Sequence, residues 1–221
     1  MKKLELQKVV LTTVLVALGI ILDLIVSQIA FLKMPMGGNL LGISMVPLVL
    51  IGFIFGMKYG FLGGILYGLY SFSLDYFTYV SAFFHDEKIV KILALIFLDY
   101  LIPFTAFGLT GLFHKKNLST INNIVLGTVF VSITRFISST LSGVILWSSY
   151  IKEAAYGVEH GDTPNIATKI FSLVNNNIWL YSAFYNVIYI LTTLIATLLI
   201  LIMIRKRILV IMERYLCSVH Q

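Results

Sequence analysis

Charged residues are scarce in this chain of 221 residues, and their scarcity excludes an ordinary soluble domain. Only 12% of the residues are Asp, Glu, Lys or Arg, whereas 59% are hydrophobic. A soluble domain typically carries about 25% charged residues, because its surface must face water. Lipid must therefore surround most of this chain, which excludes a cytosolic enzyme, a disordered tail and a secreted disulfide-bonded scaffold.

Cysteine and the common catalytic motifs are almost absent as well. The single cysteine, Cys217, lies in the basic C-terminal segment, so neither an internal disulfide nor a cysteine-rich metal site is possible. The sequence contains no HExxH, GxSxG or Walker lysine motif, and its four histidines lie far apart, outside the apolar runs. The chain is therefore predicted not to be an enzyme, and no metal or cofactor is expected to bind to it.

Six apolar runs approach or exceed the length of about 20 residues that a membrane-spanning helix needs. They cover residues 9–31, 41–55, 61–80, 90–113, 124–150 and 179–204. The second run is the shortest, and Met-Lys-Tyr-Gly at 57–60 is predicted to be the turn that closes it. We therefore predict an all-α integral membrane protein, a six-helix bundle formed by a single domain over residues 1–221.

The distribution of basic residues predicts the orientation of this bundle. If six spans alternate, ten Lys and Arg residues fall on one side and five on the other, and Arg135 is left inside a span. Such an excess marks the cytoplasmic side of a membrane. The poorer side carries the acids Asp86, Glu87, Glu153, Glu159 and Asp162. Both termini are therefore predicted to be cytoplasmic, in a multi-pass protein of the cell membrane, and the net charge of +6 needs no nucleic-acid partner.

Two local patterns bear on how the spans pack and connect. The third run carries Gly60, Gly64 and Gly68, a spacing that places a smooth stripe on one helix face and lets a neighbouring backbone approach closely. The connection 151–178 is the longest, is polar and lies on the outer side, and Gly-Asp-Thr-Pro-Asn at 161–165 marks a turn in it. Loops of this length often act as lids or binding loops, a role that the sequence leaves open.

Ionisable residues inside the predicted spans require a partner or a function, because each costs about 2.5–3.5 kcal/mol on insertion scales. They are Asp23, Asp75, Asp99 and Arg135. Asp75 lies near the outer end of its span, where water can reach it. One interpretation of the last two is an Asp99–Arg135 ion pair that holds two helices together.

The other interpretation is a binding site in the outer half of the bundle. Aromatic residues, small residues, an amide and a carboxylate share that depth in the third to sixth spans: Tyr67, Tyr70, Asp99, Ser139, Ser142, Gly143, Trp147, Tyr181, Tyr185 and Asn186. Aromatic faces attract cations, carboxylates accept hydrogen bonds from amino groups, and Asn offers both a donor and an acceptor. An aromatic belt at the membrane interface explains Tyr150 and Trp179, but it does not explain Asp99 or Asn186. The set suits a flat, nitrogen-rich, cationic molecule.

Several segments resemble a known transporter family. The run ISMVPLVLIGFIFGMKYG at 43–60 is similar to the substrate-binding membrane subunits, or S components, of energy-coupling-factor (ECF) transporters. Similarity to the thiamine-specific S component is carried by FLDYLIP (97–103), GLTGLF (108–113), GTVFV (127–131), SGVILWSSY (142–150) and YSAFYN (181–186). The resemblance covers essentially the whole chain. It implies capture of thiamine from outside and partnership with a coupling transmembrane subunit and two ATPase subunits, which hydrolyse the ATP.

The resemblance also implies roles for individual residues. Asp99 stands where the family has a glutamate facing the aminopyrimidine, Trp147 matches the tryptophan that stacks on the thiazolium, and Tyr181 and Asn186 match a binding tyrosine and asparagine. The remaining substrate-binding positions carried over are Tyr67, Tyr100, Arg135, Ser139 and Gly143. Ser139 replaces a histidine, and Asp99 is one methylene shorter than glutamate. These departures leave a thiamine precursor or another flat vitamin as the alternative ligand.

The first span carries the implied docking face for the coupling subunit. The family has two alanines four residues apart there, and this chain offers Thr13 and Ala17, with Gly19 nearby. Close helix approach remains feasible at small residues. An intramembrane enzyme and a purely structural membrane subunit are the alternatives from other classes, but the first lacks a nucleophile–base or metal constellation and the second leaves Asp99 unexplained.

Overall fold

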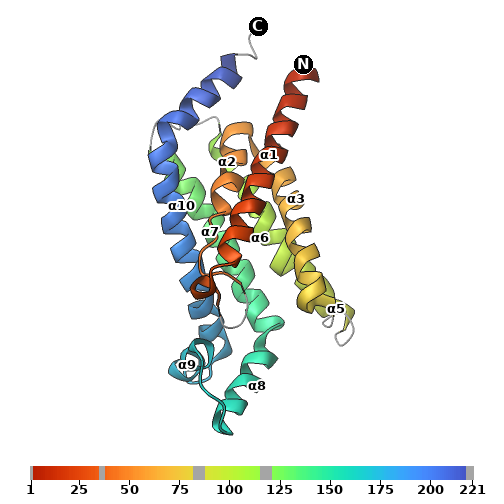
Figure 1. The fold of residues 1–221 in the computed structure, drawn as a ribbon, viewed down its shortest axis with the longest axis vertical. Helices are drawn as coiled ribbons and strands as arrows, with labels where there is room; N and C mark the ends of the chain where they lie inside the picture. Colours follow the sequence, from red (N-terminus) through yellow and green to blue (C-terminus); the bar gives the residue numbers. More distant parts are fainter. Residues whose placement is uncertain (1, 35–37, 82–87, 115–120, 218–221) are drawn as a thin grey trace.

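The computed structural model describes residues 2–34, 38–81, 88–114 and 121–217, and within these ranges the chain is helical, apart from short connections and one isolated bridge between Lys33 and Asn39. The predicted all-α class is confirmed. The helices along the bundle (Figure 1) are α1 (Lys2–Ser27), α2 (Met45–Phe55), α3 (Met57–Asp75), α7 (Ile121–Ile145), α10 (Ile178–Cys217) and a composite of α5 (Ile89–Leu95), η3 (Ile96–Leu101), α6 (Ile102–Thr105) and η4 (Ala106–Phe113). Two short helical turns, η1 (Ala30–Leu32) and η2 (Tyr76–Val80), follow α1 and α3.

Four helical stretches among the described residues are long and apolar enough to cross a membrane. They are Leu4–Ser27, Ile89–Phe113, Ile121–Ile145 and Ile178–Val210. The chain is thus a multi-pass membrane protein, and the prediction of six spans stays a prediction for the shorter α2 and for α3. The last helix is longer than the predicted run 179–204, because α10 has 40 residues and continues through the basic segment after it.

Helix α2 forms the centre of the packed part of the bundle. All eleven of its residues are buried, which is expected of a helix that is apolar on every face. Pro47 lies in its first turn, where the ring removes no helical hydrogen bond. Gly56, with a φ of +89°, ends α2, and Met57 already begins α3. The predicted turn at 57–60 is therefore wrong: the chain reverses at Gly56 alone, because only glycine readily adopts this backbone conformation.

The glycine stripe of α3 packs against the fourth predicted span, as expected. A Cβ atom at Gly64 would lie 2.3 Å from the carbonyl oxygen of Phe104, and one at Gly60 would lie 2.6 Å from the Cα atom of Gly108. No side chain fits between these backbones. The close approach predicted from the spacing is confirmed.

The outer connection differs most from the prediction. Helix α7 ends at Ile145 rather than at Tyr150, and the segment 151–178 is not a polar loop but contains most of α8 (Ser148–Glu159) and all of α9 (Ile166–Leu173). The turn predicted at 161–165 is confirmed, with Gly161 at a φ of +112° and Asn165 capping α9. Apolar residues on one face of each short helix form a small buried cluster that includes Ile151, Ala167 and Phe171. The polar composition of the segment as a whole gave no sign of this cluster in the sequence.

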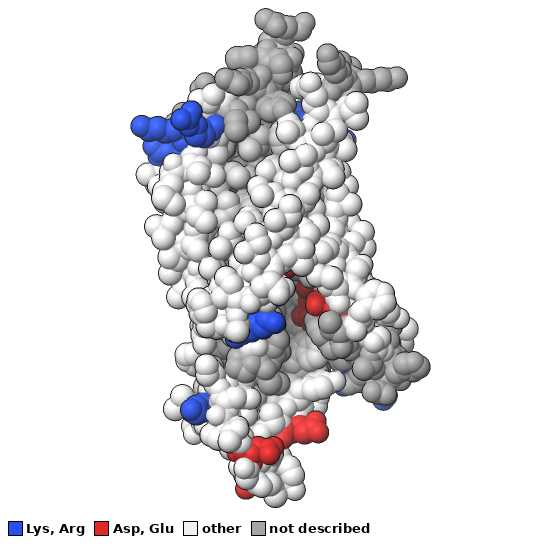
Figure 2. Space-filling model, viewed as in Figure 1, with Lys and Arg blue, Asp and Glu red and all other residues white. Residues whose placement is uncertain are grey.

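Both chain ends lie at one end of the bundle, opposite α8 and α9 (Figure 1). One cluster of basic side chains lies at the end with the termini, and others lie beside a hollow in the flank and toward the opposite end, whereas the acidic side chains visible in this view lie inside the hollow and at that opposite end (Figure 2). Asp86, Glu87, Lys115 and Lys116, which contributed to the predicted orientation, lie outside the described residues. The arrangement agrees with an even number of crossings, and the cytoplasmic location of the termini stays a prediction.

Candidate ligand-binding site

A cavity of about 640 Å³ lies in the half of the bundle nearer α8 and α9. Its walls come from α1, α3, η3, α6, η4, α7, α8 and α10, from the connection between α1 and α2 and from the break between α7 and α8. The nine residues predicted to bind the ligand all line it: Tyr67, Asp99, Tyr100, Arg135, Ser139, Gly143, Trp147, Tyr181 and Asn186. Residues from four separate helical segments thus meet around one space, although their contact with a ligand stays a prediction.

Asp99 and Trp147 form the central pair of the cavity wall. The indole nitrogen of Trp147 donates a hydrogen bond of 3.0 Å to Oδ2 of Asp99, which fixes the orientation of the ring. The sequence pattern placed Trp147 on a continuous helix over residues 124–150. In the structure Trp147 lies instead in the break between α7 and α8. The remaining oxygen, Oδ1, keeps acceptor capacity for a ligand.

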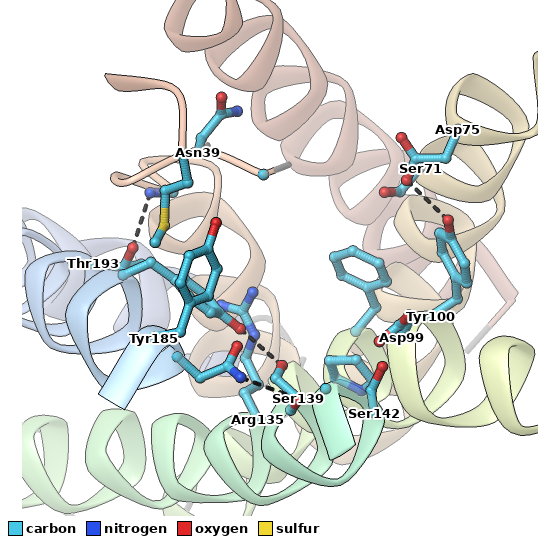
Figure 3. A pocket seen from close by; sticks show the side chains of 18 of the residues that line it. Asn39, Ser71, Asp75, Asp99, Tyr100, Arg135, Ser139, Ser142, Tyr185 and Thr193 are labelled. Atoms are coloured by element: carbon cyan, nitrogen blue, oxygen red, sulfur yellow. Dashed lines mark hydrogen bonds between the residues drawn. The ribbon is translucent and has the colours of Figure 1, made fainter. Parts of the chain in front are cut away.

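The π-helical turn η3 presents two successive residues to the cavity. On a regular helix, neighbouring side chains point about 100° apart, whereas Asp99 and Tyr100 both line the space here. Such widened turns recur at functional sites. The hydroxyl of Tyr100 donates a hydrogen bond of 3.0 Å to Asp75, the last residue of α3 (Figure 3). A carboxylate that sequence reasoning treated as hydrated therefore belongs to the cavity wall.

Arg135 does not pair with Asp99, so the predicted ion pair is wrong. Its guanidinium lies 5.0 Å from the ring centre of Phe107, and Nη1 lies 3.7 Å from the sulfur of Met45. The physical reason is depth. Arg135 precedes Ser142, the α7 residue beside Asp99 in Figure 3, by seven residues, which is about 10 Å along the helix.

The α7–α10 wall is a continuous hydrogen-bonded surface. Nδ2 of Asn186 donates to the carbonyl oxygens of Ser182, at 2.8 Å, and Ser139, at 3.2 Å. Both partners are acceptors, so the amide orientation is determined and Oδ1 is the atom available to a ligand. Gly143 permits this close packing, because a Cβ atom there would lie 2.2 Å from the hydroxyl oxygen of Ser182.

Sequence reasoning missed Tyr189 and Thr193, two lining residues on α10. The hydroxyl of Tyr189 lies 2.8 Å from that of Ser139, and Oγ1 of Thr193 accepts a 2.9 Å bond from the backbone nitrogen of Gly42. A signal for them existed in the four-residue spacing of Tyr181, Tyr185, Tyr189 and Thr193, which puts all four on one helix face. Asp23, the intramembrane acid of α1, also lines the cavity, and the hydroxyl of Tyr67 donates a hydrogen bond of 3.0 Å to Ser44.

The predicted docking residues on α1 divide between two faces. Thr13 and Ala17 are exposed on the outside of the bundle. Gly19 is buried, and a Cβ atom there would lie 3.5 Å from Cγ of Pro47 in α2. Gly19 therefore packs inward, and the outward face offers Thr13 and Ala17 alone, because two residues along a helix turn the side chain to the opposite side.

Known proteins match both the sequence and this architecture. A sequence model of the thiamine transporter protein family (Thia_YuaJ) matches residues 9–175. The chain belongs to this thiamine transporter family. The "Thiamine transporter ThiT" of Bacillus subtilis (strain 168) is 26% identical over 200 residues, which are 86% of each chain. A solved structure of ThiT from Listeria monocytogenes has the same fold, with a TM-score of 0.66 and 17% identity over 94% of this chain and 98% of that one.

Membership of the thiamine transporter family confirms the resemblance seen in the sequence. Since the family consists of transporters, the prediction that the chain is not an enzyme is confirmed as well. Its place as a multi-pass protein of the cell membrane follows from the family together with the apolar helices. The low identity to the solved structure supports the fold alone, so the roles of individual cavity residues rest on the geometry of this chain.

Proposed function

We propose that this member of the thiamine transporter family captures thiamine from outside the cell in the cavity around Asp99 and Trp147. The observation that carries this proposal is the hydrogen bond that places an aromatic ring face and a carboxylate side by side. A cationic ring gains from the indole face, and an amino group gains from the carboxylate. Thiamine combines both groups, a cationic thiazolium ring and an aminopyrimidine ring, joined by a methylene bridge.

The geometry favours one arrangement of the ligand. The thiazolium stacks on Trp147, with the buried ring of Tyr181 nearby on α10. The aminopyrimidine faces Oδ1 of Asp99 and Oδ1 of Asn186, which both accept hydrogen bonds. Tyr67, Tyr100, Ser139, Gly143 and Arg135 complete the enclosing wall.

The same proposal extends to topology and partners. Six spans with cytoplasmic termini open the cavity toward the outside, since it lies in the half of the bundle away from the chain ends. The sequence has no nucleotide-binding motif. We therefore assign energy supply to a coupling transmembrane subunit and two ATPase subunits of an ECF-type transporter, with the exposed Thr13 and Ala17 of α1 as the docking face.

A fluorescence titration with thiamine tests the site and the ligand together. The chain has two tryptophans, Trp147 in the cavity wall and Trp179, which is 57% exposed at the start of α10. Thiamine should quench the emission of the purified protein saturably. Trp147→Ala should weaken binding about 100-fold, because stacking and cation–π energy are both lost. Trp179→Phe is the matched control and should retain the quenching and the affinity.

Two results would contradict this proposal in different ways. Unchanged thiamine affinity in Trp147→Ala would place the site elsewhere in the molecule. Quenching by another flat vitamin, but not by thiamine, would favour the alternative ligand, for which the shorter Asp99 and the missing ring at Ser139 are the observations.

A further inference from the structure

Helix α9 carries apolar residues on two different faces. Ala167 and Phe171 are buried in the cluster that α9 shares with α8 and α10. Ile166, Ile170 and Leu173 follow one another at intervals of four and three residues, so they form a second apolar stripe beside the buried face. Ile166 is 61% exposed and Leu173 is 81% exposed. The stripe is thus left uncovered by the described part of the chain.

The neighbouring helix α8 has no such stripe. Its exposed residues are all charged or carry a hydroxyl group: Ser149, Tyr150, Lys152, Glu153, Tyr156 and Glu159. Each of these side chains can form hydrogen bonds with water. The two helices belong to the same outer segment, and yet only α9 exposes aliphatic side chains. A difference in their surroundings explains this contrast better than a general tolerance of exposed apolar residues.

The polar residues of α9 lie on one side of the stripe. Lys169 and Ser172 are exposed, and at about 100° per residue they fall on the side of the stripe that is away from the buried face. The helix therefore has three sectors, one against protein, one apolar and one polar. Amphipathic helices at a membrane surface bury an apolar sector among the lipids in the same way. A lysine beside that sector can lay its methylene groups along apolar surface and keep its ammonium group among the lipid phosphates.

The stripe lies next to a helix that crosses the membrane. Helix α9 contacts α10 and lies beside its start in Figure 1. Exposed apolar side chains on α10, among them Leu180, Phe184 and Leu191, form the surface that this span presents to lipid. Trp179, in the first turn of α10, is exposed as well, and tryptophan is enriched at membrane interfaces. The start of α10 therefore marks the level of a membrane interface, and α9 is beside it.

The connection from α9 to α10 is held by its own hydrogen bonds. Asn175 and Asn176 both have a positive φ, which asparagine adopts more readily than most residues, and their backbone nitrogens donate to Ser172 and Phe171 at 3.0 Å. The side-chain oxygen of Asn177 accepts a 3.1 Å bond from the backbone nitrogen of Leu180. The stripe on α9 thus keeps a defined position relative to the lipid-facing surface of α10.

We propose that the stripe formed by Ile166, Ile170 and Leu173 contacts lipid in the leaflet away from the chain termini, which is the outer leaflet in the topology proposed above. Helix α9 is then an interfacial helix, whereas the exposed face of α8 lies in water. The contact also reaches the cavity, because the ring of Phe171 packs edge-on against that of Tyr181 in the cavity wall, with 5.5 Å between the ring centres. Lipid under α9 therefore supports one wall of the binding site.

The test measures the depth of single spin labels on the full-length protein in nanodiscs of phosphatidylcholine and phosphatidylglycerol. Cys217→Ser removes the single native cysteine, and Ile166→Cys and Leu173→Cys are then labelled separately. Molecular oxygen concentrates in lipid and a nickel chelate stays in water, so collisions with the two reagents report depth. We expect both labels to lie about 5–10 Å below the lipid phosphates. Glu159→Cys, at an exposed position of α8, is the matched control and should lie in water.

Two results would overturn the inference. Labels on α9 that the nickel chelate reaches as readily as the control would place the stripe in water. Labels that neither reagent reaches would show that protein, such as a second copy of the chain, covers the stripe. The two positions are independent, so either gives the answer if the other variant melts at a lower temperature than its Cys217→Ser parent. None of these results depends on thiamine, whose binding the fluorescence titration measures separately.

Discussion

The two halves of the bundle are built from largely the same helices but packed by different rules. Around α2, near the chain termini, backbones touch through Gly60, Gly64 and Gly108, and the residues between them are apolar and buried. Nearer α8 and α9, α3, α7 and α10 spread around a cavity lined by hydroxyls, carboxylates and aromatic rings. Stability and binding are therefore separated along the length of the helices. Substitutions in the two halves should affect different measurements.

The largest effect is expected in the packed half. Gly64→Ala places a methyl group 2.3 Å from the carbonyl oxygen of Phe104, so α3 and the composite helix must move apart. We expect a loss of about 3 kcal/mol in the free energy of unfolding, as for other overpacked cores. Thermal denaturation in detergent measures it. Gly19→Ala is the control, since its methyl group would make only ordinary contacts at 3.5 Å with Pro47. Equal melting temperatures for the two variants would show that the glycine contacts are not rigid.

The second-largest effect is expected in the half of the bundle that contains the cavity. Asp99→Asn removes the charge but keeps an oxygen that accepts from Trp147, so the fold should remain stable. Thiamine affinity should fall about 10- to 100-fold, because hydrogen bonds to charged groups contribute about 1.5–3 kcal/mol. Calorimetric titration gives the value. Asp162→Asn, on an exposed acid between α8 and α9, should have no effect. A melting temperature that falls as steeply as in Gly64→Ala would argue against the separation of the two halves.

The smallest effect is expected where the halves meet. Arg135 lines the cavity but packs on Phe107, and Lys at this position keeps the charge and most of the cation–π contact. We expect Arg135→Lys to change thiamine affinity less than about threefold, since the difference in such contacts is about 0.5 kcal/mol. The same titration applies. A loss as large as that in Asp99→Asn would reveal direct contact between the guanidinium and the ligand.

The helical architecture was largely predictable, and its failures have local causes. Long apolar runs identify helices because lipid forces every backbone group to bond within its own segment. The break at Gly56 was misplaced because a single glycine at a positive φ reverses the chain without a longer turn. Helices α8 and α9 were missed because their apolar faces pack on each other and on Tyr181 rather than on the membrane core, so their composition resembles that of a loop.

The residues that line the cavity were largely predictable from the sequence, but the contacts among them were not. Depth along each span grouped seven of the nine candidate residues, the family resemblance added Tyr100 and Arg135, and the structure places all nine around one space. The hydrogen bond between Trp147 and Asp99 could not be derived, because it depends on the break that ends α7 at Ile145. Asp23 was recognised as an intramembrane acid, but its position in the cavity wall depends on helix rotation, which the sequence pattern leaves undetermined.

The hydrogen bond to Trp147 has a consequence for the thermodynamics of recognition. An indole that is already oriented by Asp99 loses little rotational freedom when a ligand arrives, so its ordering entropy was spent during folding. The indole ring is therefore held in one orientation before the ligand arrives. Affinity in such a site depends less on how many contacts the ligand makes than on how few groups must be immobilised to make them. An indole held in this way therefore contributes affinity without any increase in the contact area of the ligand.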